Sequence, residues 1–154
     1  MAKELQTARI NGTILVYAAH ATGLIYVESE SNKPTSDAFA EFKISDKSQA
    51  KTRTLKGATL PVWNQRLEIK IDYPTADQVP QMDIKLWDWN KVYSNEVLGQ
   101  VKLDLKSLFV PNENKNTWAY NEVTKLSVPK EFQGKNRSAG NIYMQMRFVP
   151  EGTD

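Results

Sequence analysis

The chain contains no cysteine and a single histidine, His20, in 154 residues. The absence of cysteine excludes disulfides, thiolate metal sites and cysteine nucleophiles, and it fits a reducing compartment. A Ser-His-Asp triad or a two-histidine zinc site would have to be built around His20 or without it. We therefore expect no enzymatic activity and assign no chemistry to His20.

Long apolar runs and a strong excess of one charge are also missing. No run approaches the roughly 20 apolar residues of a membrane span, and residues 1–6 lack the apolar core of a signal peptide. Twenty Lys and Arg against 18 Asp and Glu leave a net charge of +2, which does not favour nucleic acid as a partner. We expect an intracellular protein, cytoplasmic or peripheral to a membrane.

Apolar residues do occur at every second position, a pattern that predicts strands with one buried and one solvent-exposed face. In the segment 66–71, for example, apolar side chains at 67, 69 and 71 alternate with charged ones. The residues predicted to face inward in the clearest strands are Leu67, Ile69, Ile71, Ile84, Leu86, Ile142, Met144 and Met146. The eight predicted strands are Gly12–Ala19, Asp37–Ser45, Lys51–Gly57, Arg66–Ile71, Met82–Trp87, Val97–Leu105, Trp118–Val123 and Ile142–Phe148.

Eight one-sided strands in a chain of this length predict an all-β fold, an eight-stranded antiparallel β-sandwich. A closed, ligand-carrying barrel of the lipocalin or fatty-acid-binding kind is the alternative that this strand count leaves open. Asp104–Phe109 is expected to form one short helical turn. The sequence contains no internal repeat and no domain boundary, so we expect a single domain.

Several motifs follow one another in a characteristic order. Gly12–Leu24 is a glycine followed by alternating apolar residues and then Ala-x-x-Leu, and Leu86–Gly99 contains Trp-Asp-x-Asn and then Asn-Glu-x-x-Gly. With Ser36–Phe42, Lys51–Thr54, Leu60–Asn64 and Gly140–Phe148, the set resembles the C2 domain, the β-sandwich docking module first described in protein kinase C.

This resemblance covers nearly the whole chain. It implies the permuted, type II topology of the family, with two four-stranded sheets. It places a C2-like domain at 12–149, an N-terminal extension at 1–11 and a C-terminal tail at 150–154. The function that it implies is non-catalytic docking to anionic phospholipid membranes.

Members of the family that bind calcium hold it with loop carboxylates at one end of the sandwich, because Ca²⁺ takes several oxygen ligands. Here Asn90 replaces a carboxylate, and glutamates stand at two positions where aspartate is usual. Glu30 could take the place of Glu28 as a ligand. We expect calcium, as the possible cofactor, to bind weakly or not at all. The positions that match the family's metal ligands are Glu28, Asp37, Asp88, Asn90 and Glu96.

Some family members also bind phosphoinositide headgroups on a sheet face through lysines, a tryptophan and an asparagine. The matching positions are Lys51, Arg53, Trp87 and Asn95. A face of this kind is attracted to anionic lipid, and the attraction is screened by salt. The alternative is a charged face that is merely solvated.

Strand pairing adds a further lysine to this face. A hairpin that turns near Lys47 would set Lys43 opposite Lys51 and Glu41 opposite Arg53. Like charges that face each other across a strand pair are unfavourable unless an anion joins them. We therefore include Lys43 among the predicted lipid-binding residues, with Glu41 as a partial neutraliser.

Apolar residues also lie at the expected loop tips, at Ile25, Tyr26, Val92 and Tyr93. Such tips can enter the headgroup boundary of a bilayer or contact a protein partner. The alternative for Ile25 is that it folds back over the end of the sandwich. A second function therefore stays open, a calcium-independent protein interaction domain that serves as a structural subunit of a larger assembly.

Overall fold

The computed structural model describes residues 9–22, 25–26, 36–58, 60–89, 96–110, 118–129 and 137–152. At positions 25, 26, 36, 58, 96, 137 and 138 it describes the backbone alone. In these parts of the chain, no helix is long and apolar enough to cross a membrane.

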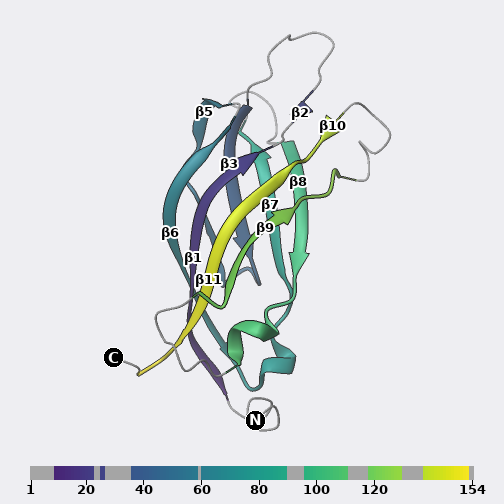
Figure 1. The fold of residues 1–154 in the computed structure, drawn as a ribbon. Coiled ribbons are helices and arrows are strands. Elements are labelled where there is room, and N and C mark those ends of the chain that lie inside the picture. The colour runs from purple at the N-terminus through teal and green to yellow at the C-terminus, as the bar shows by residue number, and fades with distance from the viewer. Residues whose placement is uncertain are drawn as a thin grey trace.

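The first sheet has four antiparallel strands, with the first and last strands of the chain side by side at its centre (Figure 1). Gly12 lies opposite Pro150, and a Cβ atom at Gly12 would come within 2.2 Å of the Val149 carbonyl oxygen. Glycine is therefore required where these two strands begin and end. In spatial order the strands are β6 (Val62–Tyr73), β1 (Ile10–Thr22), β11 (Asn141–Pro150) and β9 (Tyr120–Lys125).

The second sheet packs behind the first and is also antiparallel (Figure 1). The predicted strand Lys51–Gly57 is divided in two, and both pieces pair with the same neighbour. Thr52 lies at the break, where its hydroxyl accepts a hydrogen bond from the Ala40 amide and donates one to the Arg53 carbonyl. The strands are β4 (Gln49–Lys51) and β5 (Leu55–Ala58) along one side of β3 (Ser36–Lys43), followed by β7 (Met82–Asp88) and β8 (Glu96–Leu103).

Short elements complete the two ends of the sandwich. The strands β2 (Ile25–Tyr26) and β10 (Arg137–Ser138) pair at the upper end in Figure 1. At the lower end lie two 3₁₀ helices, η1 (Ala76–Gln78) and η2 (Lys106–Phe109). The second confirms the predicted helical turn, which is fixed by burial of Leu108 and Phe109.

The predicted core is confirmed. All eight residues expected to face inward are buried, whereas Arg66, Glu68 and Lys70 are exposed. One face of each strand therefore packs between the sheets, and the charged face meets water. With two separate hydrogen-bonded sheets, the fold is the predicted sandwich and not a closed barrel.

Candidate functional site

The outward face of the second sheet carries a row of polar residues that crosses four strands, and three of its four members are charged. Lys51 on β4 lies opposite Glu41 on β3, which lies opposite Lys85 on β7 and then Gln100 on β8. The carboxylate of Glu41 is thus flanked by lysines on both neighbouring strands. Lys85 has a second carboxylate close by, because its ammonium lies 3.8 Å from the carboxylate of Asp83 on the same strand.

The predicted register of this hairpin was wrong by two residues. Glu41 lies opposite Lys51, and Lys43 lies opposite Gln49, so Lys43 does not face Lys51 and Glu41 does not face Arg53. The cause is the turn, in which the Ile44 amide donates to the Ser48 carbonyl at 2.9 Å. The hairpin is therefore centred on residue 46 and not on residue 47.

Two aromatic rings lie beneath Lys51 and Lys85. Phe39 and Trp87 are stacked, with ring centroids 6.2 Å apart. The Lys51 ammonium lies 5.8 Å from the centre of the Phe39 ring, and the Lys85 ammonium lies 5.7 Å from that of Trp87. The indole N–H of Trp87 donates to Glu41 at 3.2 Å. Cation–π contacts and this hydrogen bond hold the charged groups in a defined arrangement.

Lys43 is on the same face but is engaged by the turn. Its ammonium lies 3.0 Å from the Asp46 carboxylate, which raises the pKa of Lys43 through their hydrogen bond and then through charge attraction. In the neighbouring row, Asp83 lies opposite both Lys43 and Lys102.

The strands of this face carry four lysines and two carboxylates, a net charge of +2, and Asp46 in the turn offsets one of the lysines. We call this surface the cationic face. Its charged residues are Glu41, Lys43, Lys51, Asp83, Lys85 and Lys102. Sequence reasoning missed Lys85 and Lys102. The alternation in 82–87 was a sufficient signal for Lys85, because it places that residue on the wet side of its strand.

Arg53 lies away from the charged row. Its guanidinium donates to the Trp63 carbonyl at 2.5 Å, and its amide donates to the Gln65 side chain at 2.9 Å. Both acceptors belong to β6, so Arg53 connects the edges of the two sheets. The structure therefore brings together Lys43, Lys51 and Trp87 from the predicted lipid set and gives Arg53 a cross-sheet contact. Asn95 lies outside the described residues.

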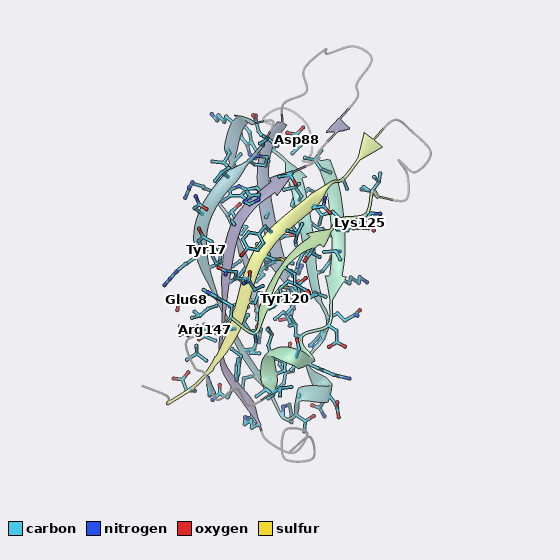
Figure 2. The ribbon with its side chains drawn as sticks, in the orientation of Figure 1. Tyr17, Glu68, Asp88, Tyr120, Lys125 and Arg147 are labelled. Atoms are coloured by element: carbon cyan, nitrogen blue, oxygen red, sulfur yellow. The ribbon has the colours of Figure 1, made fainter. Side chains whose placement is uncertain are left out.

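Two predicted calcium ligands come together at the upper end of the second sheet, where Figure 2 shows Asp88 at the end of β7. The Asp37 amide donates to the Asp88 carboxylate at 2.9 Å, and the Asp37 carboxylate accepts the Gly57 amide at 2.8 Å. Glu96 lies opposite Asp88 in the strand register. Glu28, Asn90 and the side chain of Glu96 lie outside the described residues.

Comparison with known proteins decides the family of a chain with these two sheets. The family model for the C2 domain matches residues 12–121. This chain belongs to the C2 domain family. The type II arrangement agrees with its topology, in which the first and last strands pair at the centre of one sheet.

Several known proteins resemble this C2 domain. It is 24% identical over 139 residues to tricalbin-1 of Saccharomyces cerevisiae, covering 90% of this chain and 10% of that protein. The chain therefore spans about a tenth of that relative's length. The C2A domain of a plant extended synaptotagmin 1 is 20% identical, with a TM-score of 0.67 over 90% of this chain and 95% of that one. A calcium-bound structure of the C2A and C2B domains of extended synaptotagmin 2 is 18% identical, with a TM-score of 0.64 over 90% of this chain and 46% of that one.

The carboxylates of this C2 domain have the right chemistry for calcium but are few among the described residues. Within the described ranges, no three His, Cys, Asp or Glu side chains gather into a group that could hold a metal ion. Asp37 and Asp88 each already accept a backbone hydrogen bond. Two carboxylates alone fall short of the six to eight oxygens that Ca²⁺ takes, so the other predicted ligands would have to supply the rest.

The predicted loop tips fall mostly outside the described residues. Val92 and Tyr93 are not described. Ile25 and Tyr26 form β2, opposite Ser138 and Arg137, with their backbone alone described. Their pairing places this segment at the same end as Asp88 (Figure 2).

A different surface of the C2 domain carries exposed apolar side chains. On the outward face of the first sheet, Val62, His20, Tyr143 and Val123 lie opposite one another on four successive strands. The rings of His20 and Tyr143 are 5.6 Å apart, and the two valines are 51% and 64% exposed. The outermost strands are about 14 Å apart at the usual strand spacing. We call this row the apolar stripe.

Proposed function

We propose that this C2 domain docks to anionic phospholipid membranes through its cationic face, with weak or absent calcium dependence and no catalytic role. The observation that carries the proposal is the pair of Lys51 and Lys85 above stacked aromatic rings. Such rings give the lysines a fixed position and an apolar base next to the bilayer surface. In the cell, the domain would then be cytoplasmic or bound to the surface of a membrane.

The expected binding is weak and sensitive to salt. Each Lys or Arg near an anionic leaflet contributes about 1 kcal/mol. Glu41 and Asp83 offset part of the charge of four lysines on the cationic face. At physiological salt the Debye length is about 8 Å, so only charges close to the leaflet contribute fully.

The direct test is sedimentation of the chain with phosphatidylserine-containing vesicles, in the presence of calcium or of a chelator. We expect binding in chelator that decreases as salt is raised, and little binding to neutral phosphatidylcholine vesicles. Binding that required calcium would contradict the proposed role of the cationic face.

Substitution of Glu41 by glutamine is expected to tighten binding to these vesicles about fivefold, the equivalent of one charge near the surface. Glutamine keeps a side-chain oxygen that can accept the Trp87 N–H, while the charge between Lys51 and Lys85 is lost. The measurement is vesicle titration in chelator. Glu122→Gln on β9 makes the same charge change on the other sheet, and an equal gain there would show that net charge alone matters.

Calcium should bind weakly, with a dissociation constant in the high-micromolar range or above, because the ligand set has lost charge. Asp88→Asn should abolish whatever calcium binding the wild type shows. Asparagine keeps the oxygen that accepts the Asp37 amide, so the loss would report charge and not misfolding. Calorimetry measures both proteins, with Asp83→Asn as the matched control. A sub-micromolar constant for the wild type would contradict this prediction.

The second candidate function is calcium-independent protein interaction within a larger assembly. The apolar stripe favours it, because the rings of His20 and Tyr143 connect two exposed valines in one row, and a contiguous apolar and aromatic surface marks interaction sites. Tyrosine is also enriched at the centres of protein interfaces. If the wild type never sediments with anionic vesicles, this function takes the place of membrane docking.

A further inference from the structure

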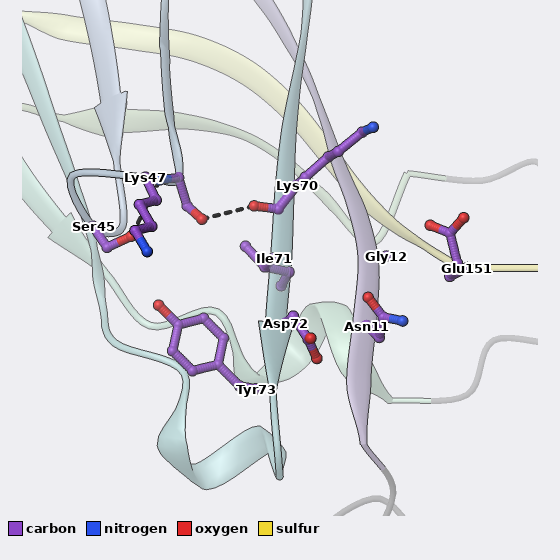
Figure 3. Close-up of a pocket in the computed structure, with 10 residues that line it drawn as sticks. Asn11, Gly12, Ser45, Lys47, Lys70, Ile71, Asp72, Tyr73 and Glu151 are labelled. Carbon is purple, nitrogen blue, oxygen red and sulfur yellow. Dashed lines mark hydrogen bonds between the residues drawn. The ribbon is translucent and has the colours of Figure 1, made fainter.

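A groove lies at the lower end of the sandwich, away from Asp37 and Asp88. It has a volume of about 370 Å³ and is lined by the turn that follows β3, the end of β6 and the start of β1 (Figure 3). Lys47, Ser45 and Tyr73 contribute side chains on one side of β6, and Glu151 lies beyond β1 on the other. None of these residues belongs to the cationic face or to the predicted calcium site.

The turn that carries Lys47 is held firmly against β6. The Ser48 amide donates to the Ser45 carbonyl and hydroxyl, both at 3.1 Å. The Ser48 hydroxyl is buried and donates to the Lys70 carbonyl at 2.7 Å, as the dashed line in Figure 3 marks. Because Lys47 lies between these anchored serines, its backbone is fixed beside the groove.

The carboxylates of Asp46 and Asp72 are each paired with a cation other than Lys47. Asp46 pairs with Lys43 at 3.0 Å, on the outward face of the second sheet. Asp72, at the groove, pairs with Arg9 at 2.8 Å. In the part of the chain that the structure describes, Lys47 forms no ion pair, and a cation beside a groove without a counter-ion attracts anions.

Two hydroxyl groups accompany this cation. The Ser45 oxygen accepts the Ser48 amide, so its own proton remains to be donated to another acceptor. The Tyr73 hydroxyl lies on the same side of β6 and points toward the Lys47 turn (Figure 3). An ammonium and a hydroxyl from the β3–β4 turn, together with the Tyr73 hydroxyl of β6, suit an anion with several oxygens. A phosphate group combines negative charge with several strong acceptor oxygens, so it can take a hydrogen bond from each of these donors.

We propose that this groove binds a phosphate monoester or free phosphate, with Lys47, Ser45 and Tyr73 as the contacting residues. Lys47 supplies the charge, and the two hydroxyls supply hydrogen bonds. Glu151 lies on the far side of β1, where it disfavours a second anion. Because the groove is at the opposite end from Asp88, it can be filled whether or not calcium binds.

The test is nuclear magnetic resonance titration of the ¹⁵N-labelled chain with inorganic phosphate at constant ionic strength. We expect saturable shifts of the amides at positions 45–48 and 73. Lys47→Ala should weaken binding about tenfold, and Tyr73→Phe should weaken it about threefold, since each removes one contact to a charged ligand. Lys106→Ala removes an exposed lysine that pairs with Asp77 and should leave binding unchanged.

Vesicles that contain phosphatidic acid distinguish a lipid source of the phosphate from a soluble one. If Lys47→Ala weakens binding to these vesicles but not to phosphatidylserine vesicles of equal charge, the monoester of a lipid headgroup fills the groove. If only the response to free phosphate is lost, the ligand is soluble. Shifts that do not saturate, or that Lys47→Ala and Lys106→Ala reduce equally, would overturn the proposal. A folded amide spectrum for each variant excludes unfolding as the cause.

Discussion

The double variant Lys51→Glu, Lys85→Glu is expected to lose all sedimentation with anionic vesicles in chelator. Both lysines lie in one row with Glu41 between them, so the variant presents three carboxylates across β4, β3 and β7. An attraction of about 1 kcal/mol per lysine becomes a repulsion of similar size, and the change is on the order of 4 kcal/mol, or about a thousandfold. Lys85 is chosen over Arg53 because Arg53→Glu would also break the contact with the Trp63 carbonyl.

A matched control separates this face from net charge. Arg66→Glu with Lys125→Glu makes the same charge change on the outward side of the first sheet, where β6 and β9 lie at opposite edges. This control is expected to retain most of the binding. Val92→Ser with Tyr93→Ser should also leave calcium-independent binding mostly intact. If the serine variant loses binding while the double glutamate variant keeps it, insertion of loop tips would replace the proposed mechanism.

The largest expected loss of stability follows Trp63→Ala. Trp63 is fully buried between the sheets, and its indole N–H donates to the Ala38 carbonyl of the opposite sheet at 3.3 Å. Removal leaves a cavity and loses this hydrogen bond between the sheets, and such a truncation costs about 3–5 kcal/mol. For a chain of this size, this lowers the melting temperature by about 10 °C.

Trp118→Ala is the control for the size of the side chain. Trp118 is half-buried and contacts the Arg147 guanidinium, 5.5 Å from its ring centre. Its loss should cost about 1 kcal/mol, because little core volume and one cation–π contact are removed. Chemical denaturation measures both variants. Equal losses at the two positions would contradict the central place of Trp63 in the core.

Alternation of apolar and charged residues was sufficient to predict which side of each strand is buried. In β6, Leu67, Ile69 and Ile71 face the core because a shift of one residue would bury Arg66, Glu68 and Lys70 instead. The penalty for burying three charges makes this choice unambiguous from sequence. The same reasoning would have placed Lys85 on the wet face.

The register of the β3–β4 hairpin could not be predicted in this way. Moving the centre of the turn from residue 47 to residue 46 changes each pairing by two residues, so every side chain stays on its original face. The hydrophobic pattern is the same before and after such a shift, so it cannot distinguish the two registers. The hydrogen bonds of the turn and the bond from Ser48 to Lys70 select the observed register.

The sequence by itself determined the two-layer sandwich, its core and its membership of the C2 family. Both the alternation of apolar side chains and the order of the motifs depend only on the positions of residues along the chain. Only the tertiary structure decided which charges meet. It set Glu41 between Lys51 and Lys85, turned Arg53 toward Trp63, and left Lys47 beside a groove. These contacts join residues on different strands, and their distances depend on turn geometry and strand register, which a period of two does not encode.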